Sequence, residues 1–117
     1  LGDRLATARP TWALGTPAAA VGAHCMRQRA FVAATRERVR VERARLRGRL
    51  SARFEVYPSD APFLLLAVPD VEAVQREVQA AGVAVRDART FRGLDSHVRV
   101  AVRTPAENDR LLEALDV

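Results

Sequence analysis

The sequence contains no lysine. Its 19 basic residues are all arginines, and together with 14 acidic residues they leave a formal net charge of +5 at pH 7. The absence of lysine excludes a Schiff base between a carbonyl compound and a lysine side chain of this chain. Arginine keeps its charge at every physiological pH and binds carboxylates and phosphates through a planar fork of donors. The charge therefore predicts an anionic partner without identifying it.

Cysteine and long apolar runs are also scarce. Cys25 is the only cysteine, so no disulfide can form within the chain, which favours a reducing, cytoplasmic location. His24 lies beside it, but no further ligands are spaced for a metal site, and we expect none. No apolar run has the length of a membrane helix, so we expect no membrane partner. Leu1 opens the sequence without a signal-peptide pattern, which predicts a native start further upstream.

The 117 residues suffice for one domain with a core of its own. Residues 1–15 are predicted to form an extended connector in which Pro10 disfavours helix and Trp12 anchors the chain by packing. Thr16 and Pro17 are a typical helix start. They predict one long helix to about residue 53, broken or bent near Gly22 or around Gln28. One stripe of this helix is apolar at helical spacing: Val32, Val39, Leu46 and Leu50.

Shorter elements follow in residues 54–117. Alternating patterns predict strands over residues 54–57, 83–86 and 97–103, and a continuous apolar run predicts a strand over 63–68 that is covered on both faces. Helices are predicted after two start signals, Asp70 and the capping box of Thr104 and Glu107. The fold class is therefore α+β, with a long N-terminal helix and a small, mostly antiparallel sheet covered by helices on one face.

The last two predicted strands carry the candidate site. If their valines face the helices, Arg86 and Arg99 face the opposite side, and Arg103 follows at the end of the same strand. Two guanidinium groups on one face repel each other unless an anion lies between them. The alternative is that both arginines are ordinary surface residues, solvated or paired with Asp87 and Asp95.

Several segments, in order and spacing, carry a resemblance to a known family. They are Tyr57-Pro58-Ser59 with residues 61–68, the run of residues 82–87, the run of residues 91–95, residues 98–102, and the helix start at residues 104–112. This set resembles the C-terminal small domain of fold-type-I enzymes that use pyridoxal 5'-phosphate (PLP), of the histidinol-phosphate aminotransferase and threonine-phosphate decarboxylase type. One departure is Pro62, where the family often has asparagine.

The resemblance implies roles for two residues and for the rest of the protein. The arginine at the position of Arg99 binds an anionic group of the substrate, and the one at Arg86 assists in gripping phosphate. PLP is held by a large domain outside this chain, to which residues 1–15 connect residues 16–117. The resemblance implies no catalytic and no cofactor-binding residue in this chain, which by itself should be inactive. The full-length enzyme is expected to be a cytoplasmic homodimer.

The substrate is left open between two members of that family. Arg103, where the aminotransferases tend to have glycine, and the segment of residues 93–96 favour a threonine-phosphate decarboxylase of cobalamin biosynthesis. The alternative is a histidinol-phosphate aminotransferase of histidine biosynthesis. In both cases the partner is a small phosphorylated amino acid or amino alcohol, and Arg103 is a possible secondary contact.

Two further functions belong to other classes. The segment from Arg27 to Arg53 contains ten arginines and only two acidic residues, Glu37 and Glu42. This helix could therefore lie along the phosphates of nucleic acid. No aromatic residues interleave with the arginines and no nucleic-acid-binding motif is present, which argues against that function. The remaining alternative is a non-catalytic interaction module that has kept the small-domain fold.

Overall fold

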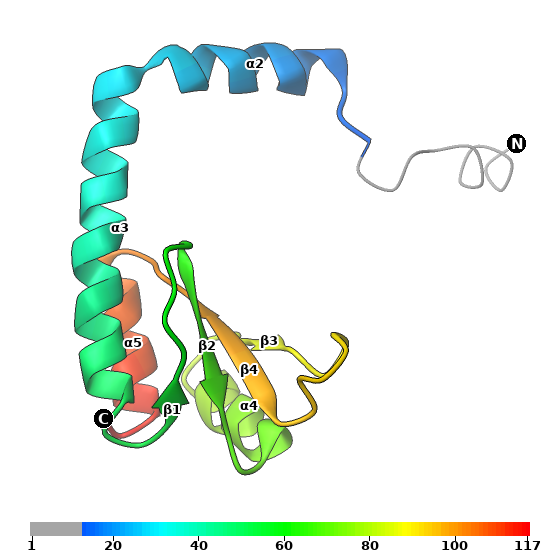
Figure 1. The fold of residues 1–117 in the computed structure, drawn as a ribbon, viewed down its shortest axis with the longest axis vertical. Helices are drawn as coiled ribbons and strands as arrows, with labels where there is room; N and C mark the ends of the chain where they lie inside the picture. The colour runs from blue at the N-terminus through cyan, green and yellow to red at the C-terminus, as the bar shows by residue number, and fades with distance from the viewer. Residues whose placement is uncertain (1–12) are drawn as a thin grey trace, which may run out of the picture. The chain divides into compact units, whose positions relative to one another are not determined.

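The computed structural model describes residues 13–117, which fall into two compact units that divide after Ala34. Figure 1 shows the order of their helices and strands. The expected connector lies almost wholly outside the described residues, as does Trp12, and residues 13–15 form no helix or strand. None of the described helices combines the length and the apolar character that crossing a membrane requires.

The first unit contains α2 (Thr16–Arg27) and the start of α3 (Arg29–Leu50). Pro17 stands in the first turn of α2, as expected from its fixed backbone angle. The helix ends at Gln28, whose backbone N–H donates to the Cys25 carbonyl oxygen over 3.0 Å. The predicted break around Gln28 is therefore confirmed, whereas Gly22 continues the helix. No residue of α2 is buried.

The second unit, Thr35–Val117, holds the hydrophobic core. Leu46 and Leu50 of α3 are fully buried, and Val39 packs at the edge of the core, as the apolar stripe predicted. Two further helices, α4 (Val71–Ala80) and α5 (Pro105–Ala114), contribute valine and leucine side chains to the same cluster. All three helices therefore pack on one side of the sheet.

The sheet has four antiparallel strands in the order β1-β2-β4-β3. They are β1 (Glu55–Val56), β2 (Phe63–Ala67), β3 (Arg86–Asp87) and β4 (His97–Ala101). Leu64, Leu66, Val98 and Val100 point into the core, and their strand neighbours point to the other face. The α+β class, the antiparallel pairing and the helices on a single face are thus confirmed.

Two details of the sheet differ from the expectations. Residues 83–85 form no strand, and β3 begins only at Arg86. Gly82 ends α4 with a positive φ of 71°, and the Val83 N–H donates to the Val78 carbonyl oxygen over 3.0 Å. Because this bond closes the end of the helix, it holds Val83 against α4 and away from the ladder of β4.

The second difference concerns the strand predicted to be covered on both faces. The core face of β2 is buried, but Leu65 and Ala67 on its other face are half-buried and Phe63 is 36% exposed. Within the second unit, residues 35–117, no helix lies over that face. We refer below to this side of the sheet, with Phe63, Leu65, Arg86, His97 and Arg99, as the outer face.

Candidate functional site

Arg86 and Arg99 lie directly opposite each other on neighbouring strands. The register of the antiparallel β3–β4 pair aligns Arg86 with Arg99 and Asp87 with Val98. Val98 is fully buried in the core, so the side chains of Arg86 and Arg99 project to the outer face. The sequence placed these two arginines on one face, and the structure brings them together there.

Arg99 is held by an aromatic ring. Its guanidinium carbon Cζ lies 4.8 Å from the centroid of the Phe63 ring, and Leu65 is its strand partner on β2. The side chain is half-buried. Among residues 13–117, no carboxylate lies within ion-pair distance of it. Its N–H donors therefore remain available to an anion.

Arg86 has similar surroundings. Its Nη2 donates to the Thr90 hydroxyl over 3.1 Å, and its Cζ lies 6.0 Å from the centroid of the Phe91 ring. The neighbouring carboxylate of Asp87 is bound instead by Arg89, with a distance of 2.8 Å between Arg89 Nη2 and Asp87 Oδ2. The hydrogen bond from the Arg89 side chain is the main reason why the pKa of Asp87 is lowered. In the described part of the chain, neither Asp87 nor Asp95 forms the ion pair that would neutralise Arg86.

His97 shares the outer face with Arg99, two residues away on β4. Its Nε2 lies 3.4 Å from the Tyr57 hydroxyl, and the two rings have centroids 5.5 Å apart. Nδ1 of the same ring is buried without a hydrogen-bond partner among the residues described. The Tyr57–His97 pair thus borders the arginines on the outer face.

Arg103 stands outside this arrangement. The strand ends at Ala101, so the alternation that placed Arg103 beside Arg99 does not extend to it. Its guanidinium binds the Glu107 carboxylate through Nε at 3.2 Å and Nη2 at 2.7 Å. Thr104 donates to the same carboxylate, and together these contacts lower the pKa of Glu107 to about 2, the Arg103 bond contributing most. Arg103 therefore stabilises the start of α5.

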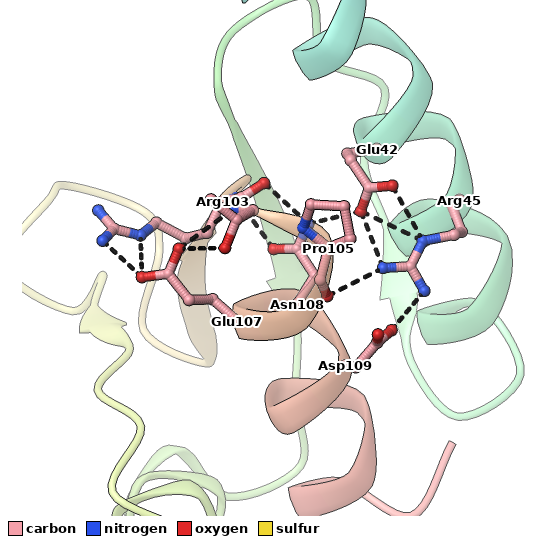
Figure 2. A network of polar contacts seen from close by, with 8 residues as sticks. Glu42, Arg45, Arg103, Pro105, Glu107, Asn108 and Asp109 are labelled. Carbon is pink, nitrogen blue, oxygen red and sulfur yellow. Dashed lines mark hydrogen bonds and ion pairs between the residues drawn. The ribbon is translucent and has the colours of Figure 1, made fainter.

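A polar network between α3 and the start of α5 was not predicted from the sequence. Asn108 is 1% exposed; its Nδ2 donates to Glu42 and to the Arg103 carbonyl oxygen, and its Oδ1 accepts the Arg103 N–H. Glu42 also binds Arg45, which reaches Asp109 over 2.7 Å (Figure 2). The network ties α3, the end of β4 and α5 together, so it supports the strand that carries Arg99.

The structure also contains a cleft of about 360 Å³ beside α5. Its lining includes residues 82–85, Ala101, Arg103 and Arg110, but neither Arg86 nor Arg99. The arginine pair therefore lies outside this cleft, on the outer face. An enclosed substrate site would need walls supplied from outside residues 13–117.

The residues of this chain do not fit a complete PLP site. PLP enzymes of the type that the sequence resembles form a Schiff base with a lysine, and this sequence has none. We therefore derive no step of PLP chemistry from this chain. What the outer face can do chemically is bind and orient an anionic group.

Comparisons with known proteins were made for both sequence and fold. The family described as aminotransferase class I and II, which is PLP-dependent, matches residues 4–115. A histidinol-phosphate aminotransferase from Archaeoglobus fulgidus is 39% identical over 102 residues, covering 87% of this chain and 32% of that protein. Another from Deinococcus radiodurans is 41% identical over 86 residues, covering 68% of this chain and 24% of that protein.

A solved structure supports the same relationship. A decarboxylase from Sulfurospirillum multivorans superposes with a TM-score of 0.69 at 26% identity, covering 89% of this chain and 32% of that one. The chain thus spans no more than about a third of the length of these relatives. Because the family match covers nearly the whole chain, this protein belongs to the class I and II aminotransferase family.

Proposed function

We propose that this chain binds the phosphate of histidinol phosphate for a PLP-dependent aminotransferase, through Arg86 and Arg99. The observation that carries the proposal is their direct pairing across β3 and β4 without a carboxylate partner in the described residues. Like charges on directly paired residues of neighbouring strands are unfavourable in the free protein. A dianionic phosphate between them would relieve the repulsion.

Arginine is well suited to this role. Each guanidinium can give a phosphate two parallel hydrogen bonds, and a hydrogen bond to a charged group contributes about 1.5–3 kcal/mol. Anchoring the phosphate at one end would also orient the reacting end of the substrate, which lowers the entropic cost of the reaction. In this proposal Arg86 and Arg99 are substrate-binding residues, and the cofactor is held by a part of the protein outside this chain.

The substrate follows from the names of the relatives. The curated proteins from Archaeoglobus fulgidus and Deinococcus radiodurans are both histidinol-phosphate aminotransferases, which favours that activity over the decarboxylase that the sequence suggested. The case for the decarboxylase depended on Arg103 and on residues 93–96, and the guanidinium of Arg103 is engaged by Glu107. We therefore propose the aminotransferase of histidine biosynthesis, acting as a homodimer in the cytoplasm.

A threonine-phosphate decarboxylase of cobalamin biosynthesis is the second candidate. One specific observation favours it, the likeness to the decarboxylase from Sulfurospirillum multivorans over 89% of this chain. Both candidate substrates carry a phosphate, so Arg86 and Arg99 would have the same role in either enzyme. The two activities differ in what happens at the other end of the substrate, away from the arginines.

An assay of the full-length protein on both substrates tests the proposal. We expect PLP-dependent transamination of histidinol phosphate with 2-oxoglutarate, and little carbon dioxide release from threonine phosphate. The reverse preference would replace the aminotransferase by the decarboxylase. Absence of activity on any phosphorylated amine, in a protein that has bound PLP, would overturn the proposal.

A further inference from the structure

Within residues 13–117, several arginines of the second unit are bound by carboxylates, whereas Arg86 and Arg99 are not. Most of those in the second unit that make ion pairs are bound by a carboxylate at 2.6–2.8 Å, as Arg89 is by Asp87. Such a contact neutralises the charge and uses N–H donors. Arg86 and Arg99 are instead placed over the rings of Phe91 and Phe63. A ring attracts the cation through its face and requires no N–H hydrogen bond.

Phe63 is placed to act on Arg99 alone. It is the first residue of β2 and pairs with Ala101, so it lies diagonally across from Arg99, whose direct partner is Leu65. Diagonal neighbours on one face are within reach of an aromatic side chain. The resulting distance of 4.8 Å from Arg99 Cζ to the ring centroid is well inside the range of a cation–π contact.

Phe91 approaches Arg86 from a different segment. It lies in the loop between β3 and β4, and its ring centroid is 6.0 Å from Arg86 Cζ. The Thr90 hydroxyl accepts one hydrogen bond from Nη2 of the same arginine. The two rings therefore contact the pair separately, one from β2 and one from the loop.

Both rings are also unusually exposed for phenylalanine. Phe63 is 36% exposed and Phe91 is 48% exposed, although burying them in the core would be more favourable. Phe54, by comparison, also contacts an arginine but is 7% exposed and belongs to the core. Within the described residues neither ring belongs to the core, so both are placed to contact the arginines of the outer face.

We propose that Phe63 and Phe91 are positioning residues for the substrate phosphate, each contacting one arginine of the outer face without occupying its N–H donors. This inference rests on the proposed function and extends it to two residues that need not touch the substrate. A carboxylate in either position would fix the arginine equally well but would compete with the phosphate. An aliphatic residue would lose the attraction between the cation and the ring face.

The test uses the full-length enzyme with PLP bound. Phe63→Leu and Phe91→Leu should each raise KM for the phosphorylated substrate by about three- to tenfold and leave kcat nearly unchanged, because a cation–π contact of this kind is modest. Phe63→Tyr and Phe91→Tyr keep the ring face and should restore KM. Calorimetry with inorganic phosphate, which involves no turnover, should show weaker binding by the two leucine variants than by the parent enzyme and the two tyrosine variants.

Double-mutant cycles separate positioning from direct contact. Phe63→Leu should have no further effect on KM once Arg99→Ala is present, yet keep its full effect beside Arg86→Ala. Phe91→Leu should show the opposite pattern, coupled to Arg86 and independent of Arg99. Additive effects of Phe63→Leu and Arg99→Ala would overturn the inference, because Phe63 would then act on the substrate by itself.

Phe54→Leu is the matched control. It removes a ring that lies 5.0 Å from Arg53 Cζ, far from the outer face, and should lower stability without changing KM. If KM rises equally in the control, the effect is one of general destabilisation and the inference is wrong. If Arg99→Ala leaves KM unchanged, the proposed function is wrong. If Arg99→Ala raises KM but Phe63→Leu and Phe91→Leu do not, only the roles of Phe63 and Phe91 are rejected.

Discussion

Asn108 connects three parts of the fold through one side chain. Its amide is 1% exposed and satisfies Glu42 on α3 as well as the backbone of Arg103 at the end of β4. Glu42 is itself 7% exposed, and its pKa is lowered mainly by the hydrogen bond from Arg45 and then by that from Asn108. A buried carboxylate of this kind is stable only while its partners remain in place.

We expect Asn108→Ala to lower the free energy of unfolding by about 2–3 kcal/mol, because it leaves the backbone N–H and carbonyl oxygen of Arg103 without their side-chain partner and removes one of the donors to Glu42 Oε2. Urea denaturation followed by circular dichroism measures the change. The exposed neighbour Asp109 provides a control, since Asp109→Ala removes only a surface ion pair and should cost less than about 1 kcal/mol. Equal costs for the two variants would contradict the role given to Asn108.

Glu107 makes part of the stability dependent on pH. Its carboxylate is held by Arg103 and Thr104, and its pKa in the folded chain is about 2, below the ordinary value of 4.5. A lowered pKa means that this stabilisation is present above about pH 4.5 and is lost as the pH falls toward about 2. Glu107→Gln should therefore be less stable than the parent at neutral pH, and the difference should shrink in acid.

Urea midpoints of both proteins across that pH range test this prediction. Asp87, whose pKa is also lowered, is unchanged in both proteins, so its contribution cancels in the comparison. A stability difference that stayed constant from neutral pH to about pH 2 would show that the Glu107 charge has no part in it.

For individual side chains, the sequence predicted only the face of a strand on which each one lies. The shared face of Arg86 and Arg99 was predictable because side chains alternate along neighbouring strands. The contact between Asn108 and Glu42 was not, because 66 residues separate them and each alone has the pattern of a solvated helix residue. The ring contacts of Phe63 and Phe91 were missed as well, because alternation along a strand does not show which arginine a neighbouring ring contacts.

The helices began where their start signals predicted. Asp70 accepts hydrogen bonds from the N–H groups of Glu72 and Ala73 at 2.9 and 3.0 Å, and α5 opens with its capping box and proline. These signals are reliable because the side chain and the N–H groups that it satisfies lie within three residues. The element boundaries at the helix starts therefore required no knowledge of the tertiary structure.

We expect Asp70→Ala to destabilise the chain by about 1 kcal/mol, since two N–H groups at the start of α4 lose their acceptor. Asp70→Asn is the matched variant, because asparagine keeps an acceptor oxygen and is nearly as good a cap. The difference between the two in thermal or urea unfolding measures the cap itself. A cost as large for asparagine as for alanine would assign the effect to charge.

The strand predicted over residues 83–86 shows where pattern reasoning fails. Alternation of valine and alanine fits a strand, but Gly82 allows a left-handed turn that returns the Val83 N–H to α4. This competition between a helix end and a strand start depends on one hydrogen bond, which the pattern of apolar residues does not reveal. The run over residues 63–68 was predicted to be covered on both faces, but no other element of residues 35–117 covers its outer face.

At the scale of the whole molecule, we propose that the chain supplies one component of a larger site. It spans 24–32% of the curated relatives considered above, lacks lysine, and presents its two candidate arginines on an open face. We expect the 117-residue chain by itself to catalyse no transamination, because nothing in it can anchor PLP on a side chain. Incubation of the purified chain with PLP, an amino donor and 2-oxoglutarate tests this; turnover would contradict it.

The central claim is that Arg99 binds the substrate phosphate. Its most direct test is the KM for histidinol phosphate in the full-length enzyme carrying Arg99→Ala, with Arg40→Ala, an exposed arginine on α3, as the control. The account predicts a rise of about tenfold or more for Arg99→Ala, as for a lost charged hydrogen bond, and no change for the control. A KM for Arg99→Ala that matched the parent enzyme would contradict it.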